Sequence, residues 1–146
     1  MIDDLYSAKV LTLAANMPRA GRLAAPQGTS EKTSKLCGSR VVVDLALEDG
    51  RVVDFAQDVK ACALGQASAA VLGAHVIGAS VEELDQALGA LTAMLKHAAP
   101  PPQGRFADLK VLEAVKDYPA RHASTLLAFE AAVEAAHKAS AGPATE

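Results

Sequence analysis

Two cysteines are the residues of this 146-residue chain best suited to bind a soft metal ion or to carry sulfur. Cys37 lies in the stretch KLCGSR, directly before Gly38, and Cys62 lies in VKACALGQASAA. The 24 residues between the two cysteines are not a recognised spacing for a zinc site. Cysteine is also common as a small buried hydrophobic residue. The spacing alone therefore leaves two possibilities, half of a metal site or two buried thiols.

The residues next to each cysteine favour a reactive thiol. Gly38 allows the backbone near Cys37 to approach a ligand closely, and Lys35 provides a nearby positive charge. Cys62 comes at or just before the start of a predicted helix, where free N–H groups stabilise negative charge. Both positions suit a thiolate.

The predicted strands surround these two turns. Residues 40–48 and 51–57 alternate apolar and polar side chains on either side of Asp49-Gly50, which predicts a β-hairpin. Residues 18–35 form a predicted loop, in which TSEKTSK at 29–35 is a possible polar edge strand. Cys37 precedes the hairpin, and Cys62 follows it.

The remaining segments have helical patterns. The expected helices cover residues 2–16 with Asp3 and Asp4 in the first turn, the stretch after Cys62, residues 80–98, residues 106–117 with Leu109, Leu112 and Val115 inward, and the stretch from Pro119 to about 139. Ser80 and Glu83 form a capping-box pattern at the start of the third of these. The order of elements predicts an α+β fold, a small antiparallel sheet of about three strands covered on one face by helices.

We expect one domain over residues 1–146, with PPPQG at 100–104 as a rigid linker and a flexible tail from about residue 140. In this fold the Cys37 turn, the Cys62 turn and the start of the last helix meet at one rim of the sheet. Side chains on turns that a rigid scaffold holds are the usual carriers of function. The rim is therefore the predicted functional site.

Composition argues against several classes of protein. The net charge is -3 and the basic residues are scattered, which argues against nucleic-acid binding. The N-terminus lacks a basic region and no apolar run is long enough to span a membrane, so we expect a cytoplasmic protein without a membrane segment. No catalytic triad, carboxylate pair or phosphate loop is present, so we expect a protein that is not an enzyme. The oligomeric state is not indicated.

Four motifs in order resemble one family. They are Asn16, Pro18 and Arg19 after the first helix, Cys37-Gly38 before the hairpin, CALGQASA from Cys62, and Pro119-Ala120-Arg121 before a Leu-Ala helix. This order resembles the U-type iron–sulfur cluster assembly scaffolds, the IscU/NifU N-terminal-like family, over roughly residues 3–136. The Cys62 segment and the Pro-Ala-Arg motif are most similar to the SufU branch.

The resemblance implies a ligand set that this chain carries incompletely. In the family, three cysteines and an aspartate hold zinc or a nascent [2Fe-2S] cluster. The first two cysteines correspond to Cys37 and Cys62, the aspartate corresponds to Ser39, and the third cysteine corresponds to Ser124. A serine hydroxyl is a poor ligand for these metals, because it must lose a proton to supply the charge of a thiolate.

Three further residues near the site follow from the same comparison. His122, two residues before Ser124, is a candidate metal ligand, with an exposed or capping histidine as the alternative. Lys35 and Arg121 flank the site and would balance the charge of a thiolate cluster or persulfide, unless they are merely solvated.

The resemblance thus implies a scaffold or carrier that binds iron, zinc or a [2Fe-2S] cluster through Cys37 and Cys62. Its implied partners are a cysteine desulfurase and cluster-accepting proteins. The alternative, which Ser39 and Ser124 favour, is a metal-free protein that keeps the fold and modulates assembly by binding the same partners.

Overall fold

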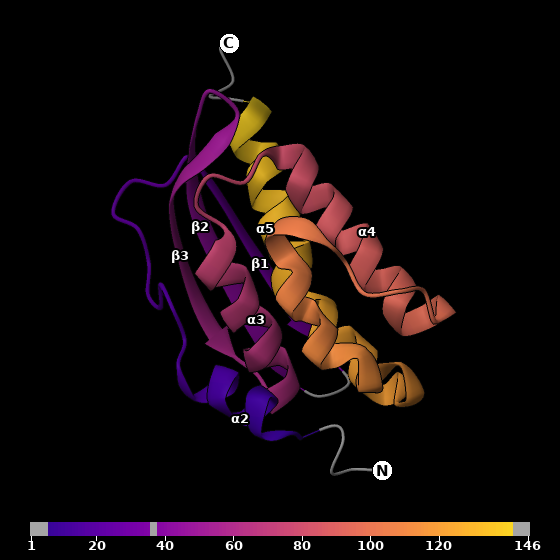
Figure 1. Ribbon diagram of the computed structural model, residues 1–146. Coiled ribbons are helices and arrows are strands. Elements are labelled where there is room, and N and C mark those ends of the chain that lie inside the picture. Colours follow the sequence, from indigo (N-terminus) through magenta and orange to yellow (C-terminus); the bar gives the residue numbers. More distant parts are fainter. Residues whose placement is uncertain (1–5, 36–37, 142–146) are drawn as a thin grey trace.

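The computed structural model describes residues 6–35 and 38–141 and contains a three-stranded antiparallel sheet (Figure 1). The strands are β1 (Gly28–Ser34), β2 (Ser39–Glu48) and β3 (Arg51–Lys60), in the order β1-β2-β3. Asp49 and Gly50 have φ angles of 54° and 77°, and two positive φ angles are what a type I′ hairpin turn requires. The hairpin and the edge strand confirm the prediction, although β3 continues to Lys60, beyond the predicted end at Gln57.

The helices of the described chain follow the predicted order. They are α2 (Ala8–Ala15), α3 (Ala63–His75), α4 (Val81–His97), the 3₁₀ helices η1 (Gly104–Asp117) and η2 (Pro119–Arg121), and α5 (His122–Ala141). Within the described residues, the predicted helix over residues 2–16 begins at Ala8, because Ser7 caps α2 by accepting a hydrogen bond from the Val10 N–H at 3.2 Å. Asp3 and Asp4 lie outside the described residues. At the other end, α5 includes Ser140 and Ala141, which were predicted to belong to the tail.

The helices lie on one face of the sheet, as the α+β prediction required (Figure 1). Helix α5 packs on β1 and β2, α3 packs on β3 and α5, and α4 and η1 form an outer layer. The side chains of Val41, Val43 and Leu45 alternate along β2 and are fully buried in the cluster that also contains Leu64 and Phe129.

Segment η1 is a 3₁₀ helix because its apolar residues recur at every third position. Phe106, Leu109, Leu112 and Val115 are all buried, and three residues per turn place them on one face. Phe106 begins this face with non-helical dihedral angles and meets the ring of Phe129 edge-on, with centroids 5.4 Å apart. The prediction that Leu109, Leu112 and Val115 face inward is confirmed.

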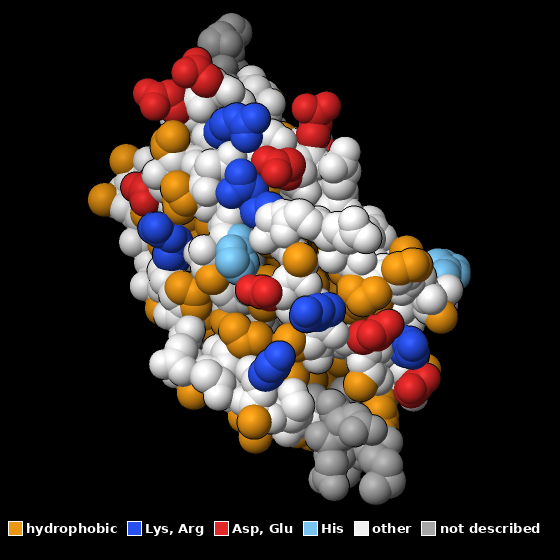
Figure 2. All heavy atoms as spheres, viewed as in Figure 1, with side chains coloured by type: hydrophobic (Ala, Val, Ile, Leu, Met, Phe, Trp, Pro, Cys, Tyr) orange, Lys and Arg blue, Asp and Glu red, His pale blue; other side chains and the backbone are white. Residues whose placement is uncertain are grey.

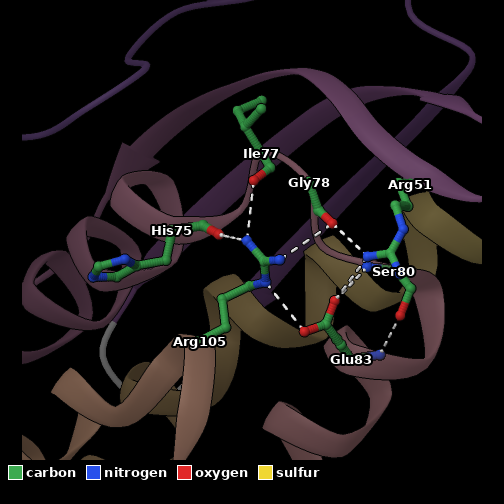
Figure 3. Close-up of polar contacts among 7 residues, drawn as sticks. All are labelled: Arg51, His75, Ile77, Gly78, Ser80, Glu83 and Arg105. Carbon is green, nitrogen blue, oxygen red and sulfur yellow. Dashed lines mark hydrogen bonds and ion pairs between the residues drawn. The ribbon is translucent and has the colours of Figure 1, made fainter.

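Helix α4 begins with the predicted capping box. The Ser80 hydroxyl accepts a hydrogen bond from the Glu83 N–H at 3.0 Å, and the Glu83 carboxylate accepts one from the Ser80 N–H at 2.9 Å. Arg51, at the start of β3, also lies 3.4 Å from the Glu83 carboxylate and donates to the Gly78 carbonyl (Figure 3). The start of α4 is thereby joined to the hairpin.

A second arginine closes the turn between α3 and α4. Arg105 of η1 donates hydrogen bonds to the carbonyl oxygens of His75, Ile77 and Gly78 at 3.1–3.3 Å (Figure 3). Its Nε lies 3.2 Å from the Glu83 carboxylate. The carbonyl groups at the end of a helix lack intrahelical partners, so Arg105 satisfies the His75 and Ile77 carbonyl groups, which would otherwise need water, and shares the Gly78 carbonyl with Arg51.

The outer face of the sheet carries a buried carboxylate. Asp44 of β2 is fully buried and accepts hydrogen bonds from Arg22 Nε at 2.6 Å and Nη2 at 3.1 Å, from the Leu23 N–H at 3.1 Å and from the Thr29 hydroxyl at 2.7 Å. Burial acts to raise the pKa of Asp44, but the hydrogen bonds from Arg22, Thr29 and Leu23 outweigh it and lower the pKa below its ordinary value. Asp44 therefore fixes the segment between α2 and β1 across this face.

The same segment covers the free edge of β3. The Gln57 N–H donates to the Arg19 carbonyl at 2.9 Å, and the Gly21 N–H donates to the Gln57 carbonyl at 2.8 Å. Ala20 forms a parallel bridge with Gln57 between these two bonds. In Figure 1 this segment is the indigo loop beside β3.

Charges of both signs are interspersed on the face drawn in Figure 2. Among the helices of the described residues, none has the length and apolar character needed to cross a membrane.

Candidate functional site

Cys62 stands where β3 passes into α3. It is the N-cap residue of α3, its side chain is half-buried, and its thiol makes no capping hydrogen bond to the helix. Since β3 ends at Lys60, only Ala61 separates the strand from the cap. A short connection of this kind fixes the direction of the Cys62 side chain.

Ser124 is the partner that the structure places beside Cys62. The two residues are 62 positions apart, and their Sγ and Oγ atoms lie 3.5 Å from each other. Ser124 lies in the first turn of α5, is almost fully buried, and also donates a hydrogen bond to the Arg121 carbonyl at 3.3 Å. Ser124, which the family resemblance places at the position of the third cysteine, is therefore in contact with Cys62, which corresponds to the second cysteine.

Gly65 allows this close approach of α3 and α5. A Cβ atom at Gly65 would lie 3.0 Å from the Ser124 carbonyl oxygen and 2.8 Å from the Ala61 Cβ. Both distances are too short for a comfortable carbon contact, so any larger residue would force the first turn of α3 away from α5. The glycine in CALGQ is thus the sequence feature that brings Cys62 to Ser124.

An open depression of about 450 Å³ lies in front of Cys62. Its lining residues are Gly38, Ser39, Val59, Lys60, Ala61, Cys62 and Gln66. Ser39, the first residue of β2, is almost fully buried and shares the helix-covered face with Val41. The predicted meeting of three segment ends at one rim therefore holds for Gly38-Ser39, Cys62 and Ser124.

Of the other predicted site residues, Lys35 and Arg121 do not line the depression. Cys37 lies outside the described residues. Lys35 is exposed in the turn after β1, and Arg121 is half-buried at the end of η2. Neither cation makes an ion pair with any residue of 6–35 or 38–141. Lys60, which the sequence interpretation missed because it ended β3 at Gln57, is the lysine that lines the depression.

His122 is turned into the protein interior. It is 9% exposed, and its Nε2 lies 3.0 Å from the Val115 carbonyl at the end of η1. Within the described part of the chain, the His122 side chain bonds to Val115, and no hydrogen bond joins it to Cys62 or Ser124. Of the two alternatives to a metal ligand, an exposed or a capping histidine, the bond to Val115 agrees with the capping role.

The described donor set does not fit a four-ligand tetrahedral site. Zinc and iron–sulfur sites use thiolate, imidazole or carboxylate ligands, whereas Ser39 and Ser124 offer neutral hydroxyls beside Cys62. Over residues 6–35 and 38–141, no group of three or more His, Cys, Asp or Glu side chains is placed to hold a metal ion. The arrangement can present one thiol with a hydroxyl partner to an open depression.

The fold and this site agree with one class of protein. Residues 5–125 match the family of NifU-like N-terminal domains, and the chain belongs to that family.

Individual relatives extend the comparison. The chain is 28% identical over 136 residues to the iron–sulfur cluster assembly scaffold protein IscU of Thermotoga maritima, covering 93% of this chain and 95% of the relative. The crystal structure of a NifU-like protein (N-terminal) from Brucella abortus is 51% identical with a TM-score of 0.94, covering 96% of this chain and 97% of the other. A SUF-system scaffold structure from Fervidobacterium islandicum, 20% identical, shares the fold with a TM-score of 0.84, over 92% and 98% of the two chains.

Proposed function

We propose that this chain is a scaffold or carrier in iron–sulfur cluster assembly, in which cysteine thiolates hold iron, zinc or a nascent [2Fe-2S] cluster as cargo. The observation that carries the proposal is the family match over residues 5–125. The position of Cys62 at an open depression supports it, because cargo must enter and leave.

Cys62 and Cys37 are the proposed sulfur ligands or sulfur acceptors. The role of Cys37 rests on the sequence resemblance, because this residue lies outside the described part of the chain. His122 is a weaker candidate, since its Nε2 already bonds to Val115 and the other ring nitrogen is the one left for a metal. Lys35 and Arg121 would balance the negative charge of a thiolate-bound cargo.

The proposed partners are a cysteine desulfurase as sulfur source and cluster-accepting proteins as recipients, in the cytoplasm. Since the cargo is assembled and passed on, the proposed role is binding and transfer rather than catalysis on a substrate. The name of the Thermotoga relative, a scaffold protein, supports this role.

Anaerobic reconstitution tests the proposal. Wild-type protein, Cys37→Ala and Cys62→Ala are incubated with iron and sulfide, desalted, and assayed for bound iron and sulfide. We expect stoichiometric binding by wild type and loss in both variants. Ser68→Ala is the matched control, since its hydroxyl is buried without a hydrogen-bond partner among the described residues and both cysteines remain. Wild type that retains no iron or sulfide would refute the scaffold proposal.

The second candidate is a metal-free protein of the same fold that modulates assembly by binding the same partners. The neutral residues Ser39 and Ser124 favour this function, because they remove two charged ligands from the family's set. Binding to a cysteine desulfurase that persists in metal-free wild type and in Cys62→Ala, together with failed reconstitution, would support it.

A further inference from the structure

The distance between Cys62 and Ser124 is that of two ligands on one metal ion. With a zinc–sulfur bond of about 2.3 Å, a zinc–oxygen bond of about 2.0 Å and a tetrahedral angle, sulfur and oxygen lie about 3.5 Å apart. The Sγ and Oγ atoms are 3.5 Å apart in the structure. The backbone therefore retains a spacing suited to two ligands, although one side chain is a hydroxyl.

This spacing is fixed by packing on both sides. Gly65 places α3 against the Ser124 carbonyl with no room for a side chain. On α5, the hydroxyls of Ser124 and Thr125 both donate to the Arg121 carbonyl, at 3.3 and 2.8 Å. Ser124 is 2% exposed, so its side chain has little freedom to turn elsewhere.

The Ser124 hydroxyl opposes tight metal binding in two ways. It is neutral, and it must lose its proton to serve as a strong ligand. Its hydrogen bond to the Arg121 carbonyl uses that proton and would be lost on ionisation. Cys62 therefore lacks a second charged ligand at the position that the geometry provides.

We propose that Ser124, as a neutral hydroxyl, weakens the binding of a single zinc ion at this site, so that the chain exchanges that ion readily. The inference rests on the proposed function and concerns how long the same site keeps what it binds. Replacing the one oxygen atom by sulfur supplies a thiolate at the existing spacing, since two sulfur ligands of tetrahedral zinc lie about 3.8 Å apart. The Ser124→Cys variant then binds zinc more tightly than the wild type does.

The experiment measures the zinc dissociation constant of the reduced, full-length chain by competition with a chromogenic chelator. Ser124→Cys is expected to bind at least tenfold more tightly than wild type, and the gain is expected to disappear in Ser124→Cys/Cys62→Ser. Cobalt substituted for zinc gives a second readout, because added thiolate ligation strengthens its sulfur-to-metal charge-transfer band. Ser68→Cys, a buried serine-to-cysteine change elsewhere on α3, controls for the added thiol and is expected to bind as wild type does.

Ser124→Ala keeps the test decisive if the cysteine variant does not fold. Because the hydroxyl is not a metal ligand in our proposal, its removal is expected to leave zinc affinity within threefold of wild type. A tenfold loss in Ser124→Ala would overturn the proposal, as would a folded Ser124→Cys without a gain or a gain that persists without Cys62. Any of these can occur while wild type still reconstitutes a cluster with iron and sulfide, so a failure here is distinguishable from failure of the proposed function.

Discussion

The two ends of helix α3 are built in opposite ways. At its C-terminal end, Arg105 binds the carbonyl groups of His75, Ile77 and Gly78 and pairs with Glu83 (Figure 3). At its N-terminal end, Cys62 leaves the helix without a side-chain cap and faces an open depression.

The difference separates a structural region from a chemical one. At the Arg105 end, charged groups satisfy one another and the backbone, so a ligand would have to break existing bonds. At the Cys62 end, the thiol has a weak hydroxyl partner at 3.5 Å, and among the described residues that line the depression only Lys60 is charged. Weak bonds are easily exchanged, which suits a site that accepts and releases cargo.

The largest expected effect of a single substitution on stability is at the Arg105 end of α3. Arg105→Ala leaves the carbonyl groups of His75 and Ile77 without their charged donor, while Arg51 still reaches the Gly78 carbonyl and Glu83. We expect it to lower the free energy of unfolding by about 2–3 kcal/mol, measured by urea denaturation. Arg121→Ala, at the open end, removes a half-buried cation without an ion pair in the described chain and should cost less than about 0.5 kcal/mol. Equal losses of unfolding free energy in the two variants would contradict the distinction between a structural Arg105 end and a chemical Cys62 end.

A glycine substitution tests the packing that positions Cys62. Gly65→Ala places a methyl group 2.8–3.0 Å from Ala61 and Ser124, and we expect a net loss of about 1–2 kcal/mol after the gain in helix propensity. Gly89→Ala in α4 meets nothing within 4 Å, so it is expected to stabilise the protein by about 0.5–1 kcal/mol. Thermal unfolding of both variants gives the comparison, and stabilisation by Gly65→Ala would contradict the described packing.

The smallest expected effect is the pH dependence of stability that Glu83 causes at the Arg105 end of α3. The Ser80 N–H, followed by Arg105 and Arg51, holds the pKa of Glu83 below its ordinary value despite opposing burial. A lowered folded-state pKa means that the carboxylate stabilises the fold above its unfolded pKa, and that this contribution is lost as pH falls through the folded pKa. We expect wild type to lose stability faster than Glu83→Gln between about pH 5 and pH 3 in urea denaturation, with a difference of about 0.5 kcal/mol at neutral pH. If the free energies of unfolding of wild type and Glu83→Gln change with pH in parallel, Glu83 does not contribute to the pH dependence of stability.

Local signals predicted the elements well because neighbouring residues determine them. The Asp49-Gly50 turn and the Ser80–Glu83 capping box need nothing beyond a few adjacent positions. The three-residue spacing from Phe106 to Val115 also contained the signal for a 3₁₀ helix, although the sequence interpretation did not use it.

Contacts between distant residues could not be predicted in the same way. Nothing in the local pattern joins Arg22 to Asp44, or Arg105 to the carbonyl groups after α3. The contact of Cys62 with Ser124 followed from the resemblance to a family rather than from their spacing. The burial of His122 depends on where η1 ends, which the sequence pattern did not specify.

The segment that crosses the edge of β3 limits how this protein can meet a partner. Many peptides bind by adding a strand to an exposed sheet edge, using the unpaired backbone groups of the last strand. At Gln57 the N–H and carbonyl groups that a peptide would need already bond to Arg19 and Gly21. Strand addition is therefore blocked at this point of β3, and a partner docking here would have to recognise side chains instead.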